Sequence, residues 1–164
     1  MNDTVDAPLT PRHWIAATAL ISGLVTCYLH LWKLGLAGPL VCTGNGGCEI
    51  AQMSAWGSFL GVDVSLIGII GYSLILATAL VGIQPRWIND PRITTALMAL
   101  IFPAILFTLR LKYAEFVILK TFCPWCAVSA VTITLHGVWV VLDRKRLRGS
   151  VEGLTSVGGT PPTG

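Results

Sequence analysis

Four apolar runs, each long enough to cross a lipid bilayer, constrain this chain more than any other feature of its sequence. They cover residues 14–32, 64–83, 93–109 and 122–142. A helix of about 20 apolar residues spans the hydrocarbon core of a bilayer. Only 12% of the 164 residues are charged, about half the share found in a typical water-soluble domain. The sequence therefore predicts an all-α integral membrane protein, built as a four-transmembrane-helix bundle.

The expected domain organisation follows from these runs. We expect one transmembrane domain over residues 14–146, with helices at about 14–34, 64–83, 93–117 and 122–142, preceded by a cytoplasmic segment at 1–13. Residues 147–164 are rich in glycine, threonine, serine and proline, which predicts a disordered cytoplasmic tail. A cleaved signal peptide is the alternative for the first run. That run is longer than a usual signal-peptide core, however, and Arg12 is its only nearby cation.

The lysine and arginine residues predict the orientation of the bundle, because cytoplasmic loops carry an excess of these cations. The richer set lies near the termini and in the loop between the second and third runs. We therefore expect both termini to be cytoplasmic, in the inner membrane of the cell, and the loop at 35–63 to be exported as a cap. Cations at the ends of apolar runs do not suggest a nucleic-acid partner. The richer set is Arg12, Arg86, Arg92, Arg144, Lys145, Arg146 and Arg148, and the poorer set is Lys33, Arg110, Lys112 and Lys120.

A Cys-Pro-Trp-Cys motif opens the fourth run, at residues 123–126. The first sulfur of such a pair lies near the unpaired backbone amides and the positive end of the helix dipole, which favours its thiolate. Pro124 suits the first helical turn, and Cys126 follows Cys123 by one turn on the same face. The motif indicates disulfide exchange, with a zinc knuckle or a structural disulfide as alternatives. We expect no metal, because the sequence offers no second tight pair of ligands.

A second cysteine pair, Cys42 and Cys48, lies in the exported loop with five residues between the two sulfurs, three of them glycine. This composition predicts a mobile segment. A disulfide on such a segment can carry electrons between a soluble dithiol and a fixed pair, because exchange needs an accessible sulfur and freedom to move. Paired cysteines that face an oxidising compartment also suggest disulfide chemistry.

The combination of these motifs is more specific than either alone. Four helices, a C-x5-C loop after the first and a C-x-x-C motif at the entrance of the fourth resemble the vitamin K epoxide reductase family and its bacterial homologues, over about residues 12–146. Further matches are Ser54, Trp56 and the stretch Ser65-x-x-Gly68-x-x-x-Tyr72. An unrelated class of four-helix thiol oxidases carries its C-x-x-C motif in the first exported loop, which is the reverse of this order.

The resemblance implies a relay of electrons from thiols to a quinone, which supports disulfide formation in exported proteins. Cys42 and Cys48 would exchange with an exported thioredoxin-like protein, Cys48 would then attack Cys123, and Cys126 would pass electrons to a quinone of the ubiquinone, menaquinone or vitamin K type. Both the quinone and the surrounding lipid would be membrane partners. The residues expected around the quinone are Ser54, Trp56, Ser65, Tyr72 and Trp125.

The chain also departs from the family pattern. Vertebrate members carry an Asn and a Tyr that are said to hydrogen-bond the vitamin K head group, and this chain has Val64 and Ala130 at those positions. This difference favours the bacterial role over epoxide reduction. The sequence has no fused thioredoxin-like domain, so the partner is expected to act in trans. Two alternatives stay open: a vitamin K epoxide or quinone reductase, and a non-enzymatic membrane scaffold with structural disulfides or zinc.

Five other residues invite simpler interpretations. We expect Cys27 to be a small buried hydrophobe and Asp63 to cap the second helix. Arg110 would extend to the lipid head groups. His30 and His136 lie near opposite helix ends with no acidic partner evident in the sequence, so we expect them to have structural or interfacial roles.

Overall fold

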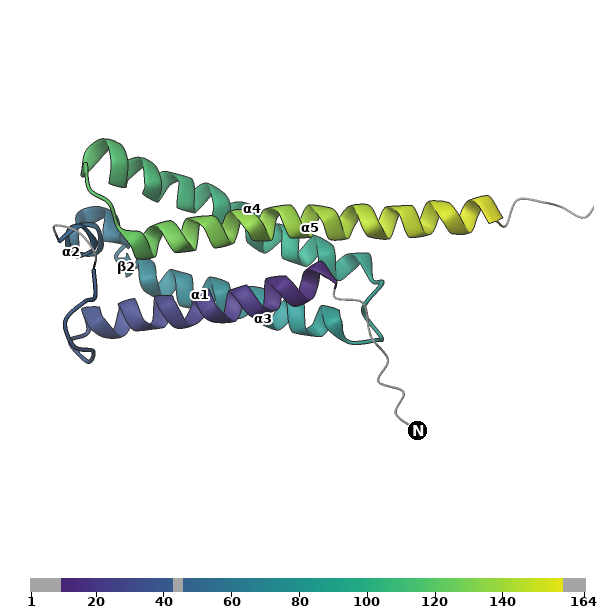
Figure 1. Cartoon of the computed structure of the whole chain (residues 1–164), viewed down its shortest axis with the longest axis horizontal. Helices are drawn as coiled ribbons and strands as arrows, with labels where there is room; N and C mark the ends of the chain where they lie inside the picture. The colour runs from purple at the N-terminus through teal and green to yellow at the C-terminus, as the bar shows by residue number, and fades with distance from the viewer. Residues whose placement is uncertain (1–9, 43–45, 158–164) are drawn as a thin grey trace, which may run out of the picture.

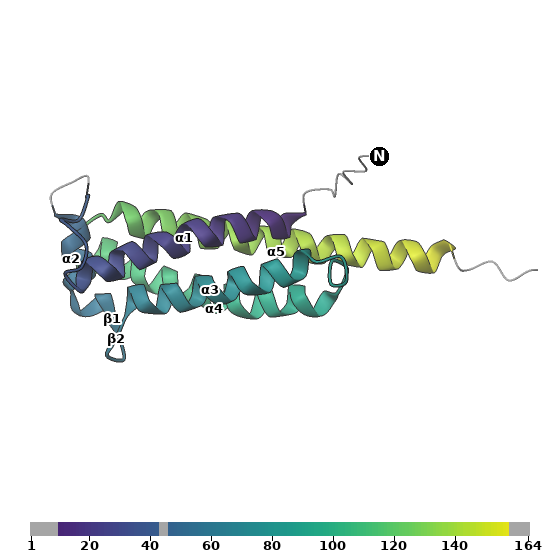
Figure 2. The same ribbon diagram turned by 90° about the horizontal axis from the view of Figure 1, so that it is seen from below.

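The computed structural model describes residues 10–42 and 46–157. Four long helices run side by side along one axis (Figures 1 and 2). Each is long and apolar enough to cross a bilayer, so the predicted bundle is confirmed and the chain is a multi-pass membrane protein. The helices are α1 (Pro11–Lys33), α3 (Val64–Ile83), α4 (Pro91–Tyr113) and α5 (Pro124–Val157), and a π-helical turn, η2 (Ala114–Ile118), extends α4.

The starts of these helices follow local rules that the sequence makes visible. Three of the four begin with proline, whose missing amide proton and fixed φ angle suit the first helical position. The remaining helix, α3, begins after Asp63, whose side chain accepts a hydrogen bond from the backbone N–H of Ser65, as expected for an N-cap. The prolines are Pro11, Pro91 and Pro124.

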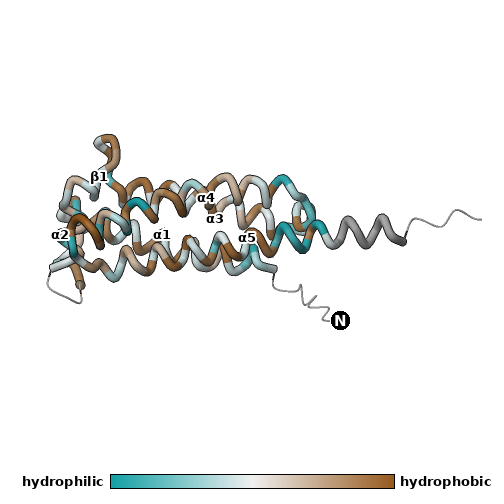
Figure 3. Tube along the Cα trace, turned by 90° about the horizontal axis from the view of Figure 1, so that it is seen from above, coloured by the Kyte–Doolittle hydropathy of each residue, from teal (hydrophilic) through white to brown (hydrophobic). Residues whose placement is uncertain are grey.

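Hydrophobic residues predominate along the four helices (Figure 3), and many of the large ones are exposed. Leu24 is 63% exposed and Leu106 69% exposed, although both lie near the middle of long helices. Large exposed side chains of this kind would form an aggregation-prone surface in water, whereas a bilayer solvates them. The core between the helices holds smaller and branched residues: Ile15, Ala16, Ala19, Tyr72, Ile75, Ala79, Leu97, Ile101, Ile133 and Val140.

Helices α1 and α3 pack closely because α3 lacks a side chain where they meet. A Cβ atom added at Gly68 would lie 2.9 Å from Cγ2 of Thr26, so the glycine lets the two backbones approach. Gly71, by contrast, has no other atom within 4 Å of the position of an added Cβ. The glycines of α3 therefore allow the close approach of α1 at one position and leave open space at another.

The fourth helix is longer than predicted. We expected it to end near residue 142 and a disordered tail to begin at 147, but α5 continues to Val157 and extends past the other helices (Figure 1). The expectation is therefore wrong for residues 147–157. The cation-rich segment after Leu142 is polar, and this polarity marked the end of the predicted membrane span. The segment also contains good helix formers and no proline, so the helix itself continues. The rest of the expected tail, residues 158–164, lies outside the described residues.

A buried guanidinium ties all four helices together at the end away from the cysteines. Arg12, expected to be only a flanking cation, is fully buried, as is Asp143. Arg12 Nε donates to Asp143 Oδ2 at 2.8 Å, and the Thr94 hydroxyl donates to the same oxygen at 2.6 Å. The other acceptors of Arg12 are the carbonyl oxygens of Gly82, Trp87 and Asp90 and the Thr94 hydroxyl, at 2.8, 3.0, 3.4 and 2.9 Å. All five guanidinium donors can thus be used.

The loop at 35–63 folds over the other end of the bundle. It contains helix α2 (Gly47–Met53), the 3₁₀ turn η1 (Ala55–Gly57) and a hairpin of strands β1 (Ser58–Phe59) and β2 (Val62–Asp63). Arg110 of α4 stacks on two aromatic rings of this cap, Trp56 at 4.7 Å and Phe59 at 5.0 Å. We had expected the Arg110 guanidinium to extend to the lipid head groups, but it contacts the cap. These contacts fix the cap to α4.

A polar clamp fixes the same cap to α1. The Asp63 carboxylate forms hydrogen bonds with His30 Nδ1 at 2.8 Å and with Lys33 Nζ at 2.7 Å. His30 therefore has an acidic partner, which the sequence did not reveal. Partial burial raises the Asp63 pKa, but the hydrogen bonds from Lys33, Ser65 and His30 outweigh it and lower the pKa from 3.8 to about 2. Asp63 therefore stays ionised at neutral pH and links the end of α1 to the start of α3.

Replacing Arg12 with Met should leave Asp143 as a buried charge without its main partner. We expect the free energy of unfolding to fall by about 3–5 kcal/mol, measured by denaturant or thermal unfolding in detergent. Arg12→Met combined with Asp143→Leu removes both charges and should recover most of the loss. The exposed Arg92 supplies the control, since Arg92→Met should change stability little. An Arg12→Met variant as stable as the wild type would contradict the structural role of the Arg12–Asp143 contact.

Candidate functional site

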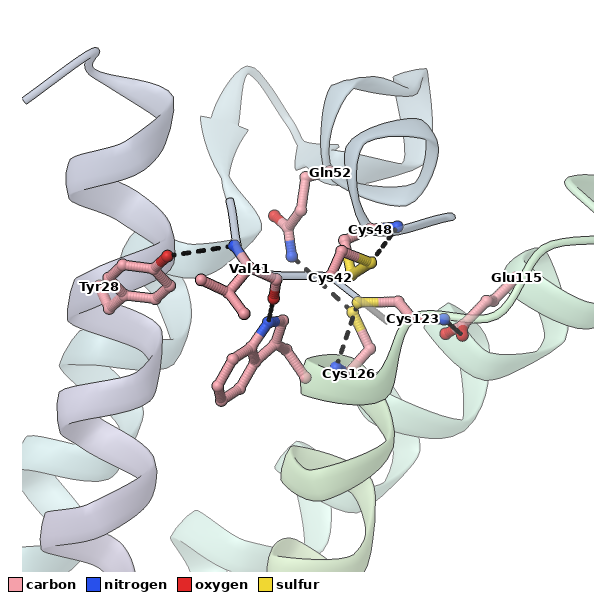
Figure 4. The surroundings of a disulfide bond; sticks show 9 residues. Tyr28, Val41, Cys42, Cys48, Gln52, Glu115, Cys123 and Cys126 are labelled. Atoms are coloured by element: carbon pink, nitrogen blue, oxygen red, sulfur yellow. Dashed lines mark hydrogen bonds between the residues drawn. A yellow bond between two sulfur atoms is a disulfide. The ribbon is translucent and has the colours of Figure 1, made fainter. Parts of the chain in front are cut away.

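Both cysteine pairs lie at the capped end of the bundle (Figure 4). Cys42 and Cys48 form a disulfide, whereas Cys123 and Cys126 are free thiols. The first pair belongs to the cap and the second to the start of α5. Segments about 75 residues apart in the sequence, Cys48 and Cys123, thus meet at one end. The site consists of one oxidised pair and one reduced pair.

The two sulfurs of the disulfide differ in environment. Cys42 is partly exposed, whereas Cys48 lies in the first turn of α2 and is fully buried. The prediction of a mobile loop is therefore wrong for Cys48, which a helix holds in place. Residues 43–45 of the predicted segment lie outside the described residues. The disulfide joins a partly exposed residue to a fully buried one.

Glycine brings the cap against the start of α5. A Cβ atom added at Gly47 would lie 2.4 Å from the carbonyl oxygen of Phe122 and 2.6 Å from the Thr121 hydroxyl, closer than any side chain permits. Gly47 directly precedes Cys48, and Phe122 directly precedes Cys123. The close approach of the two backbones therefore brings Cys48 and Cys123, the next residues along each segment, to the same part of the capped end (Figure 4).

Trp125, the third residue of the C-x-x-C motif, holds the other end of the disulfide segment. Its indole Nε1 donates to the carbonyl oxygen of Val41 at 2.8 Å, and the Val41 amide donates to the Tyr28 hydroxyl at 3.4 Å. The two aromatic rings meet edge to face. The residue before Cys42 is thus tied to both α1 and α5.

The C-x-x-C pair has the geometry expected at a helix start. Helix α5 begins at Pro124, and the Cys126 backbone N–H donates to Cys123 Sγ at 3.3 Å. A hydrogen bond from the Cys126 thiol lowers the pKa of Cys123 below its ordinary value of 9.0, and the Cys126 amide and Lys112 act in the same direction, against burial and the Glu115 charge. Cys123 is therefore the sulfur that ionises more easily.

Glu115 is a site residue that the motifs did not reveal. It lies in the η2 turn, is 3% exposed and accepts a hydrogen bond from the Cys123 backbone N–H at 2.6 Å. Its other oxygen pairs with Lys112 Nζ at 2.7 Å. π-helical turns are rare and often occur at functional sites. The available signal was an acidic residue within an apolar run, which in a membrane helix indicates a functional or internally paired charge.

An apolar cavity of about 410 Å³ lies between the four helices, below the cap. Cys126 lines this cavity and Cys123 does not. Of the residues expected around a quinone, Ser65, Tyr72 and Trp125 are in the lining. The Tyr72 hydroxyl shares a 2.8 Å hydrogen bond with Ser129 Oγ, one turn beyond Cys126. The volume and apolar lining are typical of a small-molecule site.

Two of the expected quinone residues lie elsewhere. The Ser54 hydroxyl donates to the Ala51 carbonyl oxygen at the end of α2, and Trp56 stacks under Arg110. Neither belongs to the lining of the cavity. Both shape the cap, so their spacing from Cys48 reflects the fold of the loop. Within residues 10–42 and 46–157, no group of three or more His, Cys, Asp or Glu side chains could hold a metal ion.

The remaining singled-out residues lie apart from the cysteine pairs. Cys27 is half-buried in the middle of α1. His136 lies well inside α5, fully buried, with Nε2 2.8 Å from the Thr18 hydroxyl and the rings of Tyr72 and Trp139 beside it. The expectation that it lies near a helix end is wrong, because the true helix extends 15 residues beyond the predicted end at 142.

The sequence model of the vitamin K epoxide reductase family matches residues 13–141. The match includes all of α3 and α4, both cysteine pairs and most of α1. It covers more than half of the chain, and it ends within α5, before the cation-rich extension.

Cys48 and Cys123 should form a disulfide readily when they are the remaining thiols of the site. In a Cys27→Ala, Cys42→Ser, Cys126→Ser background, mild oxidation should join them, as measured by the loss of two alkylatable thiols. Gly47→Ala forces α2 away from the Phe122 carbonyl oxygen and should slow this reaction about tenfold or more, since small misplacements of reacting atoms have large effects. Gly38→Ala is the matched control, because no atom lies near its added Cβ.

The pH dependence of Cys123 alkylation should move in opposite directions in two variants. Cys126→Ala removes the main hydrogen bond that lowers the Cys123 pKa, so the reaction should require higher pH. Glu115→Gln removes a charge that raises this pKa while keeping an acceptor for the Cys123 amide, so the reaction should begin at lower pH. The measurement is the alkylation rate against pH in a Cys27→Ala chain. Equal profiles in both variants would contradict the assigned electrostatics.

Proposed function

Because the chain belongs to the vitamin K epoxide reductase family, we propose that it is a quinone-dependent thiol oxidase that supports disulfide formation in exported proteins. Family membership makes it a membrane thiol oxidoreductase. The observation that carries the finer proposal is the order of the four sulfurs. It runs from the partly exposed Cys42, through the buried Cys48 and Cys123, to Cys126 in the wall of the apolar cavity.

The first exchange takes two electrons from a separate thioredoxin-like protein. One thiolate of its dithiol attacks Cys42, the accessible sulfur of the disulfide, and Cys48 leaves as a thiolate. The second thiol of the partner then displaces Cys42 and closes the partner's own disulfide. The partner is oxidised, and Cys42 and Cys48 become a dithiol. The exposure of Cys42 and the burial of Cys48 support this order of attack.

The second exchange moves the electrons inward. The Cys48 thiolate attacks Cys123 of an oxidised Cys123–Cys126 pair, and Cys126 leaves as a thiolate. Cys42 then attacks Cys48, restores the Cys42–Cys48 disulfide and releases Cys123. The arrangement in Figure 4, with an oxidised cap pair and a reduced helix pair, corresponds to the state after this step. The lowered pKa of Cys123 makes it a good leaving thiolate.

A quinone bound in the cavity would accept two electrons and two protons, while the Cys123–Cys126 dithiol returns to a disulfide. The net reaction converts a partner dithiol and a quinone to a disulfide and a quinol. The fit of a quinone is supported by the apolar lining from all four helices, by Trp125 and Cys126 at the capped end, and by the hydroxyl pair of Tyr72 and Ser129 within it. A ubiquinone, menaquinone or vitamin K type ring is compatible with this volume.

We place the capped end on the extracytoplasmic side of the inner membrane, with both termini in the cytoplasm. The excess of lysine and arginine at the opposite end supports this orientation, and an oxidising compartment suits disulfide chemistry. Epoxide reduction is a less favoured alternative. Val64, at the position where vertebrate members carry a polar contact, adds a hydrocarbon surface to the cavity.

The proposal is tested by quinone reduction in the purified chain. A reduced thioredoxin-like protein should drive loss of quinone absorbance, and Cys126→Ser should abolish this turnover. The half-buried Cys27 provides the matched control, because Cys27→Ser should leave turnover close to the wild-type rate. Retained quinone reduction in Cys126→Ser would sink the assignment. Turnover of vitamin K epoxide by the same preparation, without quinone reduction, would support the alternative activity instead.

A further inference from the structure

Gln52 is a polar side chain in the wall of the apolar cavity that none of the sequence motifs includes. It lies on α2, one turn after Cys48, and its side chain points from the cap toward Cys126 (Figure 4). It is 7% exposed. Gln52 Nε2 donates to Cys126 Sγ at 3.7 Å, within the range for a sulfur acceptor. One side chain of the cap thus touches the innermost sulfur of the relay.

The carboxamide oxygen of Gln52 has no hydrogen-bond partner in the described part of the chain. A buried carbonyl oxygen without a partner is unfavourable, and in native proteins such an atom usually has a ligand or water as partner. Other polar groups of the lining are satisfied within the protein: Thr26 by its own helix, Ser65 by Asp63, and Tyr72 by Ser129. Among the buried side-chain atoms of this lining in residues 10–42 and 46–157, Gln52 Oε1 is the exception.

The main chain at Gln52 is closely packed. An added Cβ at Gly57 would lie 2.1 Å from the backbone carbonyl oxygen of Gln52, so the η1 turn packs directly against the main chain of this residue. The Gly57 carbonyl oxygen in turn accepts a hydrogen bond from Lys33. The carboxamide therefore extends to the cavity from a closely packed backbone position, as binding groups in preorganised sites do.

We propose that the Gln52 carboxamide binds an oxygen of the quinone head group beside Cys126. This inference rests on the proposed function. A quinone carbonyl only accepts hydrogen bonds, whereas the hydroxyl of the quinol also donates. A carboxamide offers both groups: its second N–H can donate to the quinone, and the unpartnered Oε1 can accept from the quinol. Gln52 therefore recognises both redox forms and keeps the ring next to the reacting sulfur.

The test is a binding measurement on the full chain in detergent, with all four cysteines of the site oxidised so that no turnover occurs. The probe is 2-methyl-1,4-naphthoquinone, followed by quenching of tryptophan fluorescence, and the comparison ligand is 2-methylnaphthalene, which lacks the oxygens. Gln52→Met keeps the length of the side chain. It should weaken quinone binding roughly three- to tenfold, the effect of losing one neutral hydrogen bond, and leave the hydrocarbon unaffected.

The matched control is Thr26→Val, a polar-to-apolar change in the same lining at a hydroxyl already bonded to its own helix. It should change the affinities for both ligands equally. A second measurement needs no variant, because the infrared spectrum of the quinone bound to the wild type should show one carbonyl stretch at lower frequency. Undiminished quinone affinity in Gln52→Met, an equal loss for both ligands, or an unshifted carbonyl band would each overturn the inference.

The outcomes also separate this inference from the proposed function. A wild-type chain that binds and reduces the quinone while Gln52→Met binds it equally well would contradict the role of Gln52 alone. A wild-type chain that neither binds nor reduces any quinone would remove both proposals together.

Discussion

The buried contact between Arg12 and Asp143 is the interaction on which the arrangement of the helices depends. A lipid bilayer offers no water to an unpaired polar group, so every charge within it must be paired by the protein itself. Arg12 reaches acceptors on α3, α4, α5 and the loop between α3 and α4. It thereby fixes the end of the bundle that carries no chemistry. The four helices can then enclose a cavity at the capped end without losing their mutual order.

At the capped end, one short helix connects the two halves of the chemistry. Helix α2 carries Cys48 in its first turn and Gln52 one turn later, so the buried sulfur of the disulfide and the side chain that faces the cavity belong to one short helix. Gly47 and Gly57 let this helix pack against backbone on both sides. Any displacement of α2 would therefore affect thiol exchange and the cavity at once. Contacts through Asp63 and Arg110 hold the rest of the cap on the bundle.

The sequence predicted the spans well because bilayer thickness imposes a length that hydropathy reports. Residues 64–83 coincide with α3 at both ends. Hydropathy failed where a helix leaves the membrane, since the charged part of α5 keeps helical propensity without apolar character. The cysteines were recognisable from their spacing, whereas Glu115 and Gln52 were not. Each forms a hydrogen bond with a cysteine residue, Glu115 with Cys123 across 8 residues and Gln52 with Cys126 across 74. Only the folded structure brings Gln52 and Cys126 together.

The burial of the two central sulfurs bears on how the relay stays specific. Cys48 and Cys123 are both fully buried, so the fold limits the access of small thiols from solution to these two sulfurs. In the proposed relay, electrons enter through the partly exposed Cys42 and leave through Cys126, which lines the apolar cavity. Exchange between Cys48 and Cys123 then occurs away from water and from competing thiols. Under the proposed function, the cap would separate a soluble reductant from a membrane oxidant, and the Cys42–Cys48 disulfide would connect them.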